Sequence, residues 1–315
     1  MALEVFQLQY NQNITYKTYV DTIGVNPQLV DRMENIPFLP IQFFKNKIIK
    51  TGEFEPEIIF KSSGTTGANT SRHYVKNLSL YKKSFTLGFN LFYGNPKDWC
   101  IVGLLPGYLE RQNSSLVTMV NELIIESGNT RSGFYLHDHE NLYDVLLQNE
   151  LIRQQTLLIG VTFALLDFCE NYSMHLHHTT IMETGGMKGR REEMTREEIH
   201  SLLWNKLGTQ SIHSEYGMTE LLSQAYSKEN GLFNCPPWMK IFIRDETDPL
   251  SVIIRLEKTK PTSGLLNVID LANLYSCSFI AADDVGKLYE KGDFEVMGRR
   301  DMSDMRGCSL LTAVK

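Results

Sequence analysis

At 315 residues the chain is long for one domain and short for two, and 42% hydrophobic and 22% charged residues are typical of a globular protein. A formal net charge of −6, with no basic stripe, argues against a nucleic-acid partner. The longest apolar runs are too short or too interrupted to span a bilayer, and the N-terminus lacks the features of a signal peptide. The five cysteines are scattered and odd in number, which indicates reduced thiols and predicts a cytoplasmic protein.

The first fifty residues are predicted to be largely helical, except for an extended, proline-pinned segment at 36–41. A buried strand is then expected at 57–60 and a second short strand at 71–75. These two strands would form a hairpin whose connecting loop is exposed to a cleft.

Helices and buried strands alternate in the middle of the chain. Helices are predicted at 78–94, 116–126, 142–149 and 192–203, with Ser114 and Ser115 as candidate caps, and strands at 100–106, 156–161 and 181–183. This alternation predicts an α/β fold with a largely parallel sheet, in which ligands bind at the carboxyl ends of the strands. The last third is predicted to be β-rich, with strands at 239–244, 251–255, 264–270, 283–288 and 294–301.

The loop of the expected hairpin carries a small polar motif, which consists of Ser62, Ser63, Gly64, Thr65, Thr66 and Gly67. Its glycines allow the backbone to approach a ligand closely, and its hydroxyl and backbone N–H groups can donate hydrogen bonds to phosphate oxygens. It is not a Walker A loop, because no Gly-Lys-Ser/Thr follows. Taken alone, the motif fits a phosphate-binding loop and a flexible connection about equally well.

Two later segments have residues suited to a nucleotide. Gly185 and Gly186 follow the strand at 181–183, where they permit backbone contact with a ligand or form a simple tight turn. The segment 216–220 then combines an aromatic ring, a glycine, a hydroxyl and a carboxylate. An aromatic side chain can cover a base, a threonine can hold a phosphate, and a glutamate can bind Mg²⁺.

In this order the segments resemble the signatures of the adenylate-forming enzymes, the superfamily of acyl-CoA synthetases and luciferases. Ser62–Gly67 is similar to their phosphate loop, 216–220 to their Tyr-Gly-x-Thr-Glu signature, and 284–286 with 298–301 to their late Gly-Asp and Gly-Arg-x-Asp pair. Within the superfamily the chain looks most like the acyl-protein synthetases of bacterial bioluminescence, which activate fatty acids in a fatty acid reductase complex. The segments that carry this likeness are 36–40, 43–45, 105–111, 114–116, 185–189 and 306–310.

The resemblance implies one adenylate-forming catalytic domain over 1–315, with sub-lobes at 1–175 and 176–315 and without the C-terminal cap domain of typical superfamily members. It also implies ATP and Mg²⁺ as cofactors, with Ser62–Gly67 on the β- and γ-phosphates. Tyr216 would stack on adenine beside Gly217, Thr219 would touch the α-phosphate, and Glu220 would be the Mg²⁺ ligand.

The same resemblance places Asp284 and Arg299 on the ribose, and Gly185 and Gly186 on the adenine side. The sequence departs from the superfamily at Asn69 and Thr70, where a Pro-Lys pair is usual, so that either Arg72 or Lys188 would have to supply the missing positive charge. The chain also stops fourteen residues after Asp301, which favours the acyl-protein synthetases over coenzyme A ligases.

The expected function is ATP-dependent activation of a fatty or other carboxylic acid to an acyl-adenylate, followed by transfer of the acyl group to a protein thiol. Cys308, close to the C-terminus and near Arg306, is the candidate acceptor, from which the acyl group would pass to a partner such as an acyl reductase. Two alternatives stay open: transfer to coenzyme A or a carrier-protein thiol, and a degenerate nucleotide-binding regulatory subunit. The sequence also leaves a homo-oligomer open.

Overall fold

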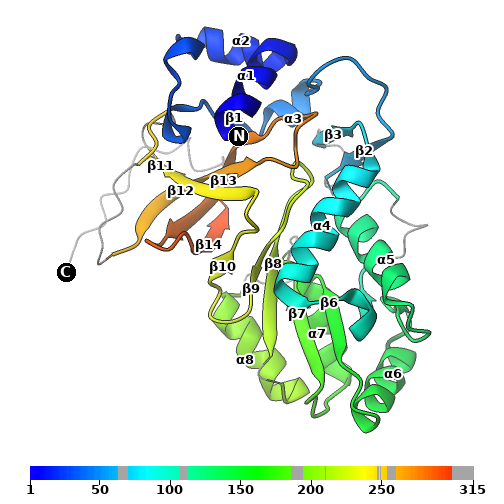
Figure 1. The fold of residues 1–315 in the computed structure, drawn as a ribbon. Coiled ribbons are helices and arrows are strands. Elements are labelled where there is room, and N and C mark those ends of the chain that lie inside the picture. The colour runs from blue at the N-terminus through cyan, green and yellow to red at the C-terminus, as the bar shows by residue number, and fades with distance from the viewer. Residues whose placement is uncertain are drawn as a thin grey trace, which may run out of the picture.

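One mixed sheet of twelve strands runs through the molecule (Figure 1). The computed structural model describes residues 1–62, 70–106, 112–185, 194–209, 211–246, 248, 250–253 and 260–299. The strands follow the order β11-β12-β13-β14-β10-β9-β8-β7-β6-β4-β5, and β1 adds to β13. The predicted α/β fold with a β-rich C-terminal part is therefore confirmed.

The parallel half of the sheet is formed by alternating strands and helices from the middle of the chain. Its strands are β4 (Cys100–Leu104), β5 (Gly133–Phe134), β6 (Thr156–Gly160), β7 (Thr179–Glu183) and β8 (Ile212–Tyr216). Its helices are α4 (Leu78–Tyr93), α5 (Ser115–Ser127), α6 (His139–Leu151), α7 (Thr162–Asn171) and α8 (Arg196–Leu207). Every residue of β4 and β6 is buried, as expected of strands covered on both faces by helices.

The remaining half of the sheet is antiparallel, apart from the parallel pairing of β1 (Leu39–Pro40) with β13. Its strands are β9 (Ala225–Ser227), β10 (Phe233–Asn234), β11 (Met239–Arg244), β12 (Thr262–Asp270), β13 (Phe279–Leu288) and β14 (Phe294–Arg299). The amino-terminal helices lie over β12 and β13 at the top of Figure 1; they are α1 (Ala2–Gln12), α2 (Ile14–Thr22) and α3 (Phe43–Asn46). Single-turn helices are formed by Pro27–Leu29, Met33–Asn35 and Pro96–Asp98.

The expected hairpin is present as a separate two-stranded sheet of β2 (Ile58–Lys61) and β3 (Arg72–Val75). The strand at 57–60 was expected to be buried, but Phe60 is the only buried residue of β2. Among the described residues this sheet consists of only two strands, so it covers fewer of their side chains than the main sheet does.

Several other boundaries differ from the sequence-based expectation. Helix α7 was not predicted, because its apolar run continues from β6 without a break. Helix α5 begins at Ser115, with Ser114 as its N-cap through a bond from the Val117 N–H to its Oγ. In place of the strand expected at 251–255, the described residues there form an isolated bridge between Val252 and Arg244. None of the described helices is both long and apolar enough to cross a membrane.

Two hydrophobic clusters form the core. One surrounds the parallel strands and their helices, with Phe85, Leu158 and Phe168 fully buried. The other joins the amino-terminal helices to the antiparallel strands, with Phe6 and Phe279 in edge-to-face contact at 6.4 Å. Strand β8 lies between them, because Ile212 belongs to the first cluster and Tyr216 to the second.

Candidate active site

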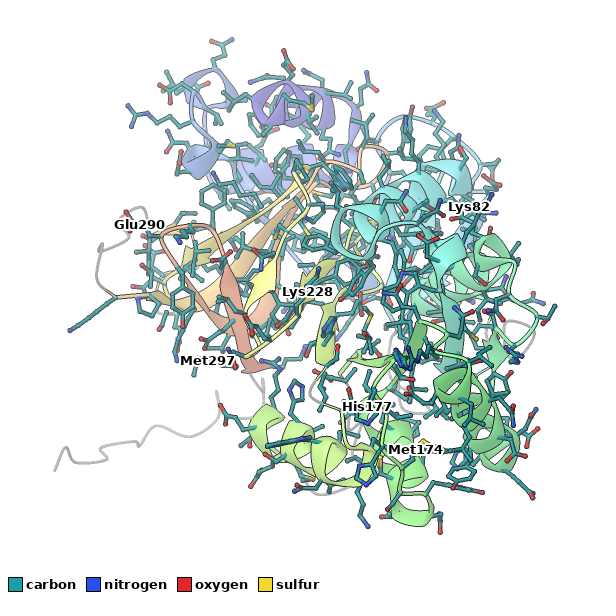
Figure 2. All side chains as sticks on the ribbon, turned by 60° about the horizontal axis from the view of Figure 1, so that its bottom comes forward. Lys82, Met174, His177, Lys228, Glu290 and Met297 are labelled. Atoms are coloured by element: carbon teal, nitrogen blue, oxygen red, sulfur yellow. The ribbon has the colours of Figure 1, made fainter. Side chains whose placement is uncertain are left out.

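A cavity of about 660 Å³ lies where the two halves of the sheet meet. Its walls are the ends of β7 and β8, the start of α8, and strands β13 and β14. Met297, labelled in Figure 2, is on β14 at the rim of this cavity, on the side that faces α8. The cavity therefore lies at the carboxyl ends of parallel strands, where α/β sheets bind their ligands.

Three predicted nucleotide-binding residues meet on one wall of the cavity. The Tyr216 hydroxyl donates a hydrogen bond to Asp284 Oδ2 at 2.9 Å, and Arg299 Nε lies 3.5 Å from Asp284 Oδ1. Burial raises the pKa of the Asp284 carboxyl, although Arg299 and Tyr216 oppose that shift. An arginine and a carboxylate with unused lone pairs, beside an aromatic ring, form a suitable surface for a ribose and a base.

The floor of the cavity is formed by the end of β7 and the start of α8. Glu183, which is buried, accepts hydrogen bonds from the Thr162 hydroxyl at 3.1 Å and the Gly185 N–H at 2.9 Å. Its other oxygen lies 3.7 Å from Arg196 Nε. Helix α8 begins with a capping box, in which Thr195 and Glu198 exchange side-chain and backbone bonds. These bonds fix the Glu183 carboxylate in the cavity wall.

A second carboxyl group, Glu215, lines the same cavity one residue before Tyr216. Burial, and then the charge of Glu183, raise its pKa to about 8. The side chain lies against Gly217, where an added Cβ would be 2.4 Å from Oε1 of Glu215. A side chain at position 217 would therefore displace the carboxyl, which explains why the signature has a glycine there.

Thr219 and Glu220 lie beside the cavity rather than in its wall. The Thr219 carbonyl accepts a hydrogen bond from His73 Nδ1 at 2.8 Å, and the Glu220 carbonyl accepts one from Asn273 Nδ2 at 2.6 Å. His73 Nε2 lies 2.9 Å from Asn273 Oδ1, so this buried network joins β3 to the signature and to the β12–β13 connection. Burial raises the pKa of the Glu220 carboxyl, which is opposed first by a hydrogen bond from Ser71.

Ser71 also closes the base of the candidate phosphate loop. Its N–H donates to Ser62 Oγ at 3.0 Å, and the Ser62 N–H donates to the Ser71 carbonyl at 3.2 Å. The two ends of the loop are thus held together directly beside the Glu220 carboxyl. A carboxylate next to a phosphate loop is a typical environment for Mg²⁺, which usually takes one or two carboxylates together with phosphate oxygens.

The structure therefore brings several predicted residues together: Gly185, Tyr216, Gly217, Asp284 and Arg299 line one cavity, and Ser62 lies near Glu220. His73 is fully buried and supports the signature through the Thr219 carbonyl. Arg72, a candidate for the missing positive charge, is exposed on β3 opposite Lys61. The following candidate residues lie outside the described part of the chain: Ser63, Gly64, Thr65, Thr66, Gly67, Asn69, Gly186, Lys188 and Cys308.

Glu183, Arg196 and Glu215 line the cavity but were not predicted as site residues. The Thr-x-x-Glu pattern at Thr195–Glu198 signals the start of α8. It could have predicted Arg196 as the first residue of a helix that begins near the end of β7. Glu183 stands out as a charged residue at the end of an apolar strand. That Glu215 is a neighbour of Glu183 follows only from the pairing of β7 with β8, in which Glu183 lies opposite Ser214.

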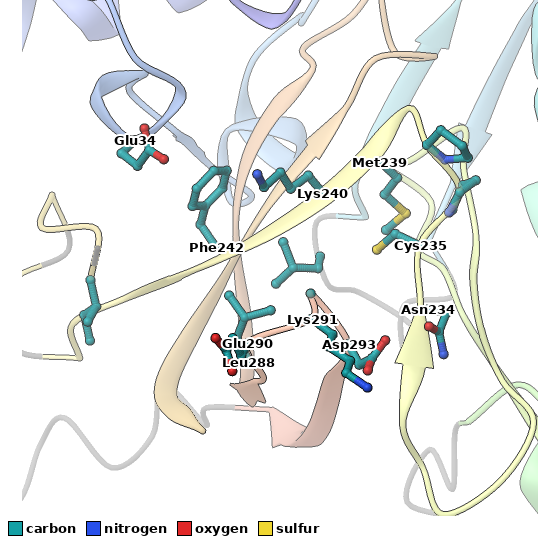
Figure 3. A pocket seen from close by; sticks show the side chains of 15 residues that line it. Glu34, Asn234, Cys235, Met239, Lys240, Phe242, Leu288, Glu290, Lys291 and Asp293 are labelled. Atoms are coloured by element: carbon teal, nitrogen blue, oxygen red, sulfur yellow. The ribbon is translucent and has the colours of Figure 1, made fainter. Parts of the chain in front are cut away.

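A separate cavity of about 440 Å³ lies between the turn after β13 and the loop before β11 (Figure 3). Its wall includes Cys235, Lys240, Phe242 and Lys291, and none of the predicted site residues. Burial raises the pKa of the Cys235 thiol to about 12. This cysteine is therefore protonated near neutral pH, in contrast to an activated nucleophile.

The acyl-protein synthetase family model ("Acyl-protein synthetase, LuxE") matches residues 1–315. The chain belongs to this family. A curated relative, the long-chain-fatty-acid–luciferin-component ligase of Vibrio harveyi, is 25% identical over 335 residues, which cover 97% of this chain and 84% of the relative.

Solved structures confirm the adenylate-forming fold of this acyl-protein synthetase family member. ATP-bound MatB from Rhodopseudomonas palustris superposes with a TM-score of 0.55 at 17% identity, covering 78% of this chain and 49% of MatB. The luciferase-like enzyme from the nonluminescent mealworm Zophobas morio superposes with a TM-score of 0.52 at 14% identity, covering 79% of this chain and 59% of the enzyme. The chain spans about half the length of such solved structures. The chain therefore combines membership of the acyl-protein synthetase family with the fold of the adenylate-forming enzymes.

Proposed function

We propose that the protein uses ATP and Mg²⁺ to convert a fatty acid to an acyl-adenylate and then transfers the acyl group to its own Cys308. A partner protein, such as an acyl reductase, would take the acyl group from that thioester. The fatty acid as substrate is supported by the name of the Vibrio harveyi relative.

The observation that carries this proposal is the meeting of Tyr216, Asp284 and Arg299 across one cavity. These residues come from strands β8, β13 and β14, yet a hydrogen bond of 2.9 Å and an ion pair of 3.5 Å join them. Their chemistry suits an adenosine: Asp284 can accept from ribose hydroxyls, Arg299 can donate to the same sugar, and Tyr216 can cover the base.

The first half-reaction needs no general base, because a carboxylic acid is ionised near neutral pH and attacks the α-phosphate itself. The residues have to position the two reactants in line and donate to the charged oxygens. The serine and threonine hydroxyls of 62–66 and Thr219 would provide such donors, and Arg72 or Lys188 a cation. Bound through Glu220, Mg²⁺ would neutralise charge on the pyrophosphate leaving group.

The second half-reaction needs a thiol, and the described cysteines are poor candidates. Cys100, Cys169 and Cys277 are buried in the core, as expected from their apolar settings, and Cys235 is half-buried. Burial raises the pKa of Cys169, Cys235 and Cys277 to about 12, and also raises that of Cys100. A thiol is a nucleophile only as the thiolate, so this elimination supports Cys308 as the acceptor.

Labelling with a radioactive fatty acid in the presence of ATP tests the acyl transfer. We expect the wild-type protein to acquire hydroxylamine-labile label, and Cys308→Ser to lose this label while it still exchanges pyrophosphate into ATP. A matched Cys235→Ser variant should keep both activities. Label that persists in Cys308→Ser would contradict the assignment. Exchange without any label on the wild-type protein would instead favour coenzyme A or a carrier thiol as the acceptor.

A further inference from the structure

The two carboxyl groups in the cavity, Glu183 and Glu215, have opposite environments. Glu183 is held by the Thr162 hydroxyl, the Gly185 N–H and the Arg196 guanidinium. Within the part of the chain that the structure describes, Glu215 has neither a cation nor a hydrogen-bond donor against its carboxyl. One carboxyl is therefore held in place by its partners, and the other is left available to react.

The groups that face Glu215 do not neutralise it. Tyr81 and Tyr93 are on α4, and Tyr226 is the residue of β9 that pairs with Glu215. Glu183 is on the other neighbouring strand, β7. Burial, and then the charge of Glu215, raise the pKa of all three tyrosines, so they remain protonated phenols. Burial and a neighbouring anion thus hold Glu215 at the edge of ionisation near neutral pH, as is typical of a general base.

We infer that Glu215 is the general base of the thiol-transfer step, a role that rests on the proposed function of the cavity. In this step the Glu215 carboxylate takes the proton of the attacking thiol as its sulfur forms a bond to the acyl carbon. The bond from that carbon to the phosphate oxygen then breaks, and the electron pair leaves with AMP. Glu215 returns its proton to solvent after AMP and the thioester separate.

Glu215 is well placed for this step because of its neighbours in the chain. Tyr216 and Gly217 directly follow it, and both line the cavity proposed to hold the adenylate. Its Oε1 lies against Gly217, where an added Cβ would be 2.4 Å away. The first half-reaction has no proton to remove, so the role of Glu215 would be confined to the second.

The test compares both half-reactions of Glu215→Gln between pH 6 and pH 10. At pH 7 we expect pyrophosphate exchange to stay within about threefold of wild type, while thioester formation slows by about 100-fold, the usual effect of losing a general base. Below pH 8 both rates should rise about tenfold per pH unit, in the wild type as Glu215 ionises and in the variant as the thiol ionises. The defect should therefore stay constant up to pH 8 and shrink only above it, where the wild type levels off while the thiol continues to ionise up to about pH 8.5. In the wild type, thioester formation should rise through an apparent pKa near 8 that is missing from the exchange reaction.

Glu140→Gln is the control, because Glu140 is an exposed carboxylate in the first turn of α6, outside the cavity. We expect it to behave as wild type in both half-reactions. An equal defect of Glu215→Gln in both half-reactions would overturn the inference. If that variant does not fold, Glu215→Asp replaces it: thioester formation should slow while pyrophosphate exchange is unchanged, and an equal effect on both would again overturn the inference. Failure of the wild-type protein to exchange pyrophosphate would instead overturn the proposed function.

Discussion

The buried imidazole of His73 is the residue that joins the candidate phosphate loop to the signature. It is fully buried and lies in edge-to-face contact with Phe44 at 5.9 Å. Its Nδ1 holds the Thr219 carbonyl, and its Nε2 contacts Asn273, which in turn holds the Glu220 carbonyl. His73 thus positions the two residues that are proposed to contact the α-phosphate and Mg²⁺ without touching either ligand.

Replacing His73 by leucine leaves the Thr219 carbonyl without its donor and removes the contact of Nε2 with Asn273. We expect a loss of about 1–3 kcal/mol in the free energy of unfolding and a KM for Mg·ATP raised by tenfold or more, with a much smaller change in the KM for the acid. Gln9→Leu is the control. Gln9 is equally buried and bonds to Asn273 and Leu274 through their backbone carbonyls, and to Ser278. If both variants raise the KM for Mg·ATP equally, His73 has only a structural role.

His73 also makes stability depend on pH. Burial lowers its pKa to about 4, whereas an unfolded histidine has a pKa near 6.5. Between these values the unfolded chain binds more protons, so this contribution is fully present above pH 6.5 and is lost as the pH falls toward 4. We expect the wild type to lose about 2 kcal/mol more than His73→Leu between pH 7.5 and pH 5 in urea unfolding. An equal loss in both proteins would contradict the expected pKa.

Some residues of the candidate site could be predicted from the sequence, and others could not. Tyr216, Asp284 and Arg299 could be assigned because their motifs follow a known order along the chain. Glu183 and Glu215 could not, because which side chains share a cavity depends on the register between β7 and β8. A strand shifted by one residue would turn Glu215 to the opposite face of the sheet.

At the scale of elements, the β13–β14 ribbon carries the proposed ribose site. Asp284 and Arg299 are directly opposite each other in its register, and the register shifts between Val285 and Gly286. Gly286 allows the strands to approach, because a Cβ there would lie 2.3 Å from the Glu295 carbonyl oxygen and 2.7 Å from Leu266. The geometry of the ribose site thus depends on a glycine two residues away.

Gly286→Ala should push β14 away from β13 and separate Arg299 from Asp284. We expect a loss of about 1–3 kcal/mol in the free energy of unfolding, together with weaker binding of ATP in a calorimetric titration. The control is Gly88→Ala in α4, where an added Cβ has no neighbour within 4 Å and should slightly stabilise the helix. If Gly286→Ala is destabilised but binds ATP with unchanged affinity, the ribose site does not depend on the close approach of β13 and β14.

At the scale of the whole molecule, the two ends of the described chain form one unit. Leu39 and Pro40 pair with Ile280 and Ala281, and Gln9 bonds to residues more than 260 positions away. Local periodicity predicted the helices at the start and the strands at the end. It could not predict that they pack together, because that contact depends on long-range pairing rather than on any local pattern. The division into sub-lobes at 1–175 and 176–315 stays a prediction.

The antiparallel half of the sheet, with the amino-terminal helices on it, meets the parallel half at the cavity. The central claim is that this cavity binds ATP and activates a fatty acid. The most direct measurement is acid-dependent exchange of labelled pyrophosphate into ATP, scanned over fatty acids, with Asp284→Ala beside the wild type. We predict exchange that requires a fatty acid and Mg²⁺, and a KM for ATP raised at least tenfold by Asp284→Ala. ATP binding without exchange for any acid would contradict this account and favour a nucleotide-binding regulatory subunit.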